Sequence, residues 1–187
     1  MSPDSQPERK YPDMWVDPED DPREVESISR GEKAVLAEYL DRYRKTLEMK
    51  CEGLDPEQLA RRSVPPSTMS LLGLVRHMAA VEHRWFQLAL QGKDEPRLYN
   101  KSVDRDADFD HAVGDPAVVE EAFATWHAQV RAAEEYYDAV TDLGATVDLD
   151  GDDVEIRDIV VHMIEEYARH CGHADLLREC VDGRTGQ

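Results

Sequence analysis

Four residues of types that commonly bind metal ions lie close together near the C-terminus of this 187-residue chain. They are His162, Glu166, His170 and His173, in a segment without proline. An α-helix advances about 100° per residue, so these side chains fall within about 80° of one another on a helical wheel. An imidazole and a carboxylate four residues apart lie on one helix face, and bundle metal sites use inward-facing side chains of this kind. The pattern predicts a metal-binding helix with Glu166 and His170 turned toward the core.

A simpler interpretation is a structural helix whose histidines are core residues with hydrogen-bonded neighbours. Four ligand-type residues on one narrow arc favour the metal site, because buried imidazoles and carboxylates need partners. Two ligands on one helix cannot hold a divalent ion, so another helix must supply a third. The best candidate is His77, on the apolar face of the segment 67–92, and Glu82 at the edge of that face is the alternative. His83 points the opposite way and is expected to be a solvated surface residue.

Four segments carry apolar residues at helical spacing and are bounded by capping residues or glycine. They span residues 31–52, 67–92, 115–142 and about 154–182. Four amphipathic helices of this length predict an all-α four-helix bundle. The polar connection 93–114 is long, and loops of this length are typical of a lid or a pocket wall. His111 in this connection and His127 on the third helix are expected to be solvated.

The rest of the chain is polar and short of periodic apolar residues. Residues 1–28 are expected to form an extended arm, tacked onto the surface by Trp15 and Val16, while residues 29–187 form the bundle. The acidic stretch 144–153 is expected to be a linker with a short extended piece. Its acidic residues do not follow the ligand order of an EF-hand loop.

The composition restricts the function classes. With 22 Lys and Arg against 41 Asp and Glu, the formal net charge is −19, which argues against nucleic acid or an anionic membrane surface as a partner. We find no apolar run long enough to span a membrane and no signal-peptide pattern. The three cysteines form no CxxC pair and are expected to be reduced thiols in a cytoplasmic protein.

Two stretches resemble a known family. Residues 70–86 (SLLGLVRHMAAVEHRWF) and residues 160–186 (VVHMIEEYARHCGHADLLRECVDGRTG) are similar to motifs of the DinB-like superfamily, and most closely to its actinobacterial mini-circle-protein and mycothiol-dependent transferase branch. The similarity runs from about residue 31 to residue 186. It implies a DinB-like four-helix bundle in up-down-down-up order with a long crossover. It also implies a divalent metal ion bound by His77, Glu166 and His170.

The resemblance also implies a function. The family uses the metal to activate a low-molecular-weight thiol, mycothiol in actinobacteria, as a metal-bound thiolate that attacks an electrophilic small molecule. We therefore expect a metal-dependent thiol S-transferase with mycothiol as co-substrate and Zn²⁺ as the favoured metal, Ni²⁺ being the alternative. The competing interpretations are a non-enzymatic metal-binding stress-response bundle and a metal-dependent hydrolase. Either a monomer or a homodimer is compatible with the sequence.

Overall fold

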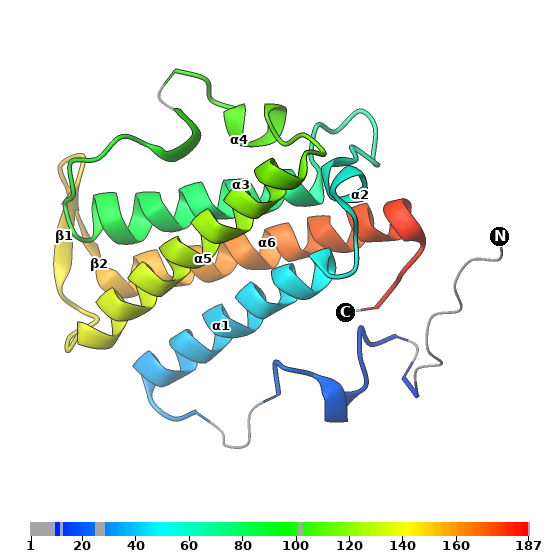
Figure 1. Ribbon diagram of the computed structural model, residues 1–187. Helices are drawn as coiled ribbons and strands as arrows, with labels where there is room; N and C mark the ends of the chain where they lie inside the picture. The colour runs from blue at the N-terminus through cyan, green and yellow to red at the C-terminus, as the bar shows by residue number, and fades with distance from the viewer. Residues whose placement is uncertain (1–9, 12, 25–28, 101–102, 187) are drawn as a thin grey trace, which may run out of the picture.

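The computed structural model describes residues 10–11, 13–24, 29–100 and 103–186. The chain is mostly helical, and four long helices lie side by side with α1 packed along α6 and α3 along α5 (Figure 1). These four helices are α1 (Glu32–Cys51), α3 (Leu71–Glu82), α5 (Pro116–Ala139) and α6 (Ile156–Asp182). The shorter elements are η1 (Pro18–Asp20), α2 (Pro56–Ala60), η2 (His83–Ala89), η3 (Leu98–Asn100), α4 (Ala107–Asp110), β1 (Thr146–Leu149) and β2 (Asp152–Glu155). The all-α prediction is thereby confirmed. No helix of the described ranges is long and apolar enough to cross a membrane.

The helix ends follow from local sequence. The side chain of Ser70 accepts a hydrogen bond from the backbone N–H of Gly73 at the start of α3. Asp115 does the same for Ala117 at the start of α5, where Pro116 at the first helical position has no N–H to leave unpaired. Helix α6 ends at Gly183, whose φ of 81° lies in the left-handed region that glycine adopts without strain. These caps fix the starts of α3 and α5 and the end of α6.

A buried polar network crosses the bundle core at Glu82. Arg44 of α1 donates to both carboxylate oxygens of Glu82, over 2.8 and 2.9 Å. Tyr167 of α6 donates to the same carboxylate, and Trp126 of α5 donates to the Tyr167 hydroxyl. Burial of a charge is tolerated when it is paired and hydrogen-bonded in this way. The network therefore ties all four long helices together at one level of the bundle.

Helix α3 continues into a π-helix, which the sequence analysis did not anticipate. From His83 to Ala89 the backbone widens, and the N–H of Leu90 bonds to the carbonyl of Trp85 five residues earlier. A wider turn changes the angular position of the residues that follow it, so the 100° wheel becomes unreliable toward the end of η2. The prediction that His83 is a solvated surface residue was wrong for a different reason. The N–H of His83 still bonds to the carbonyl of Ala79, so the wheel gives its direction correctly, but α3 is buried on all sides and Glu95 of the following connection lies against this face. The side chain of His83 is only 4% exposed, and its Nε2 lies 3.3 Å from Glu95.

The stretch 144–153 forms most of a two-stranded hairpin. Strands β1 and β2 pair antiparallel, with Val147 opposite Val154. The turn residues Asp150 and Gly151 both have positive φ, 58° and 99°, which is the geometry that an Asp-Gly pair favours in a two-residue hairpin turn. The expected short extended piece is thus present, but it is paired rather than a simple linker.

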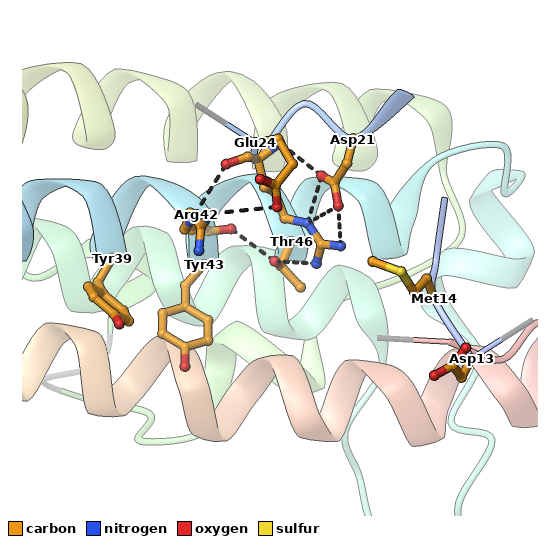
Figure 2. A pocket seen from close by; sticks show the side chains of 9 residues that line it. Asp13, Met14, Asp21, Glu24, Tyr39, Arg42, Tyr43 and Thr46 are labelled. Carbon is orange, nitrogen blue, oxygen red and sulfur yellow. Dashed lines mark hydrogen bonds and ion pairs between the residues drawn. The ribbon is translucent and has the colours of Figure 1, made fainter. Parts of the chain in front are cut away.

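The described part of the N-terminal arm packs against α1 and the end of α6. Trp15 is 1% exposed, with the Lys50 ammonium 3.9 Å and the Arg184 guanidinium 3.7 Å from its ring centre. Arg23 forms an ion pair with Asp21 at 2.7 Å and also donates to Thr46 of α1 (Figure 2). The expected anchoring by Trp15 is confirmed and is stronger than surface tacking. The boundary at residue 28 lies outside the described residues and stays a prediction.

A cavity of about 460 Å³ lies between the arm and α1. Two arginines line it: Arg42 lies beside Glu24 (Figure 2), and Arg23 forms its ion pair with Asp21. Arg42 lies within 3.6 Å of Glu24 and 3.7 Å of Glu38. Since its two arginines are paired and none of the candidate metal ligands lines it, this larger cavity is separate from the site described next.

Candidate metal centre

The structure brings His77, Glu166 and His170 together between α3 and α6. Each residue offers one potential ligand atom, and these three atoms all lie within 4.8 Å of one another. The Nε2 of His170 is 3.5 Å from Glu166 Oε2, and the rings of His77 and His170 meet edge to face with centroids 4.7 Å apart. For comparison, zinc bonds of about 2.05 Å in a tetrahedron place neighbouring ligand atoms about 3.4 Å apart. The three side chains are thus arranged as a set that could hold a metal ion.

His77 is oriented by a residue that the sequence analysis did not single out. Asp108 of α4 is fully buried, and its carboxylate accepts a hydrogen bond from Nδ1 of His77 over 2.8 Å. Phe109 stacks on the other side of the imidazole, with centroids 5.3 Å apart. A proton held on Nδ1 leaves the lone pair of Nε2 free for a metal ion, as in carboxylate–histidine–metal arrangements. The connection 93–114 therefore forms a wall of the site, as its length predicts.

Glu166 lies among imidazoles. A hydrogen bond with His170 lowers the pKa of Glu166, and the nearby rings of His162 and His77 act in the same direction. His162 is at the rim, with Nε2 3.5 Å from Glu166 Oε1 and its ring against Trp85. These contacts keep Glu166 ionised, which is the form that binds a metal ion.

His173 contacts the site from one turn further along α6. Its Nδ1 lies 3.3 Å from Nδ1 of His170, so a proton on His170 Nδ1 can be donated to it. Burial lowers the pKa of His173, and the electrostatic influence of His170 and Arg169 acts in the same direction. A neutral His173 can accept that hydrogen bond, which leaves Nε2 of His170 facing Glu166.

A cavity of about 250 Å³ opens directly onto these residues. His77, His162 and Glu166 contribute to its wall. The remaining lining residues come from α3, the π-helix and the connection that follows it: Ala80, Val81, Arg84, Trp85, Arg97 and Leu98. The candidate ligands thus face a space large enough for a small molecule.

Comparison with known proteins identifies the family. Residues 35–183 match the model of the mycothiol S-transferase family, which is most of the chain. The chain belongs to the mycothiol S-transferase family. The predicted membership of the DinB-like superfamily and its mycothiol transferase branch is thereby confirmed. The comparison with curated proteins gave no significant match.

A solved structure supports the fold of this mycothiol S-transferase family member. It is the crystal structure of a conserved protein from Enterococcus faecalis, with a TM-score of 0.63 and 18% sequence identity. The similarity covers 83% of this chain and 99% of the other. At this identity the likeness concerns the fold alone.

The donor set of this family member fits a divalent metal ion. Two imidazole nitrogens and one carboxylate oxygen suit Zn²⁺ and related ions, and three protein ligands leave a coordination position for another molecule. His77 and His170 each have a neighbour at Nδ1, namely Asp108 and His173, so both rings can present Nε2. The residues present therefore match the chemistry of a catalytic rather than a closed structural site.

The other residues considered from the sequence lie elsewhere. Glu82, the alternative third ligand, is bound to Arg44 and Tyr167 in the core network and does not belong to the cluster. His111 is exposed, as expected. His127 has 41% of its side chain exposed and bonds to Glu48.

The cysteines are poor nucleophiles. Burial raises the pKa of both Cys51 and Cys171 to about 12, so both are thiols at neutral pH. Cys171 also lies 3.5 Å from the carbonyl of Tyr43 on α1, on the side of α6 away from the cluster. Cys180 is exposed near the end of α6. The two buried cysteines, Cys51 and Cys171, are therefore not ready nucleophiles.

Proposed function

We propose that this protein is a metal-dependent thiol S-transferase that conjugates mycothiol to an electrophilic small molecule. The observation that carries the proposal is the cluster of His77, Glu166 and His170, two of which, His77 and Glu166, line a cavity of about 250 Å³. A divalent metal ion held by these residues would lower the pKa of a coordinating thiol and make it a thiolate at neutral pH. We favour Zn²⁺, with Ni²⁺ as the alternative.

The protein's own residues orient the ligands and shape the space beside them. Asp108 holds the proton of His77 at Nδ1, and His173 provides an acceptor for the proton of His170. The apolar side chains of Val81, Trp85 and Leu98 restrict water in the cavity. A restricted, apolar cavity strengthens the interaction between reacting groups and limits hydrolysis of the electrophile.

The reaction forms a carbon–sulfur bond. The thiol sulfur provides the electron pair and its proton is released to solvent at the cavity mouth. In a displacement, the leaving group departs with the electron pair of the bond that breaks. In an addition, that electron pair moves to the neighbouring atom, which then takes up a proton. Neither case requires an oxidant or reductant.

Further features of the proposal follow from the family resemblance. We place the protein in the cytoplasm, where low-molecular-weight thiols are kept reduced, and we expect a monomer or a homodimer. The up-down-down-up order of the bundle also belongs to the proposal. The long connection from the end of η2 to α5 supports it, because such a connection can return the chain across the bundle.

Conjugation of mycothiol to 1-chloro-2,4-dinitrobenzene, an uncharged electrophile, tests the proposal. Turnover should require both the metal and the added thiol, and Glu166→Gln should lose most of it because the ligand set loses its negative charge. Glu165→Gln changes an exposed neighbour on the same helix and serves as the control. Turnover that persists in chelator-treated protein, or metal-loaded protein that uses no thiol with any electrophile, would refute the transferase assignment.

A further inference from the structure

The cavity beside the candidate ligands carries two arginines whose role the proposed function leaves open. Arg84 comes from the π-helix and Arg97 from the connection that precedes η3, and both line the cavity together with His77 and Glu166. Two different segments of the chain thus bring two guanidinium groups to one cavity.

Neither guanidinium forms an ion pair with an acidic residue in the described part of the chain. Among the residues that the structure describes, no ion pair or hydrogen bond involves the side chain of Arg84 or Arg97, apart from the contact of Arg84 with the face of Trp85 at 5.2 Å. The arginines of the larger cavity differ, since Arg23 and Arg42 both lie against carboxylates. The chain has 41 acidic residues and a net charge of −19. Two arginines without an ion pair in one cavity therefore make a locally positive site on an acidic protein.

The two charges influence each other. Partial burial and the positive charge of Arg97 lower the pKa of Arg84, while Asp150 of the hairpin turn acts against this. Two like charges held near one another are relieved by an anion that binds between them. A carboxylate is the best match in shape, because a guanidinium can donate two parallel hydrogen bonds to its two oxygens.

Apart from the two arginines and His77, His162 and Glu166, the cavity wall is apolar. Ala80, Val81, Trp85 and Leu98 offer no strong hydrogen-bonding group apart from the indole N–H of Trp85. A molecule that fits this space would place its hydrocarbon part on these residues and its anionic group at the arginines. Its remaining end would face His77 and Glu166, where the proposed function places the thiol.

We propose that the electrophilic substrate is a small organic carboxylate, and that Arg84 and Arg97 bind its carboxylate group and orient its reactive carbon toward the metal centre. The assignment of the bound molecule as the electrophile rests on the proposed function. The anion site itself does not depend on that function. The overall negative charge of the protein would slow the approach of anions, and the two arginines provide the local attraction that offsets it.

Binding of two unreactive molecules of nearly equal size tests the site directly. Calorimetric titration at low ionic strength should give phenylacetate at least about tenfold tighter binding than phenylacetamide, as expected for charge-assisted hydrogen bonds. The preference should fall toward one in the double variant Arg84→Gln and Arg97→Gln. Arg131→Gln, an exposed arginine of α5 that lines none of the described cavities, should retain it.

A carboxylate could also bind the metal ion, so the titration is repeated on chelator-treated protein. The preference should persist there if the arginines carry it. Equal affinity for the acid and the amide, or a preference that needs the metal and survives the double variant, would overturn the inference. Both arginines are exposed, so the double variant should fold. Its circular dichroism spectrum checks this.

Two kinetic comparisons separate this inference from the proposed function. In the double variant, kcat/KM should fall more for 4-chloro-3,5-dinitrobenzoate, which carries a carboxylate, than for uncharged 1-chloro-2,4-dinitrobenzene. If the wild type conjugates neither electrophile while the acid preference holds, the transferase function is refuted and the anion site stands. If the KM for N-acetylcysteine changes relative to that for its amide in the double variant, the arginines recognise the thiol, and their assignment to the electrophile is overturned.

Discussion

Replacing Asp108 with asparagine removes the negative charge that faces His77 and leaves the size of the side chain almost unchanged. The carboxylate is fully buried and accepts the Nδ1–H of His77 over 2.8 Å. Removal of such outer-shell partners costs about 10- to 100-fold in metal affinity, or about 1.4 to 2.7 kcal/mol. Because Phe109 still stacks on the imidazole at 5.3 Å, the ring keeps its place. We therefore expect the lower end, a loss of about tenfold.

Zinc affinity is measured by competition with a chromogenic chelator at constant pH. Asp110→Asn is the matched control, because Asp110 lies on the same short helix, is half-exposed and pairs with Arg62 instead. Urea unfolding of the apo-proteins separates a metal effect from a loss of stability. An Asp108→Asn variant that is fully folded and binds zinc as tightly as the wild type would refute the role assigned to Asp108.

Three further predictions concern the core, the arm and the cysteines. Arg44→Met leaves the Glu82 carboxylate buried without its cation and should lower the free energy of unfolding by about 3 to 5 kcal/mol. The control Lys45→Met removes a more exposed ion pair and should cost less than about 1 kcal/mol. Equal effects of the two variants in urea titrations would contradict this. Trp15→Ala should lower the free energy of unfolding by about 3 kcal/mol in the same assay, because Trp15 is 1% exposed. The helical circular dichroism should persist, because Trp15 lies outside the continuous core. An unchanged urea midpoint would mean that the arm contributes no stability. Replacing all three cysteines with alanine should leave mycothiol conjugation intact, and a fully folded but inactive variant would show that a protein thiol takes part.

The helical part of the fold and the three candidate ligands could be predicted because they depend on one periodicity. Residues Glu166 and His170 are four apart on a regular helix, and His77 lies on the regular part of α3, so a 100° wheel places all three correctly. The wheel gives the direction of His83 but not what covers it, and Glu95 of the following connection lies against that residue. The change of the backbone to a π-helix at His83 was also not predicted. Nothing in the local sequence of this segment announces that change. The wheel is reliable only while the hydrogen-bonding pattern stays i to i+4.

Other features depend on contacts between distant segments, which a single sequence does not reveal. Asp108 lies 31 residues from His77, and in an acidic connection it looks like any other solvated carboxylate. The pairing of Arg44 with Glu82 likewise needs α1 and α3 to be aligned. The hairpin is a different case, because Asp150-Gly151 between two alternating stretches is a recognisable turn signal. That signal was present and could have been used.

The central claim is that His77, Glu166 and His170 bind one divalent metal ion. Elemental analysis of protein purified without chelator and supplied with zinc tests it most directly, with His170→Ala as the variant and His111→Ala, an exposed histidine, as the control. The account predicts about one ion per chain in the wild type and the control, and little in His170→Ala, since two remaining ligands hold a divalent ion weakly. Wild-type protein that takes up no metal, or a folded His170→Ala variant that stays fully occupied, would contradict it.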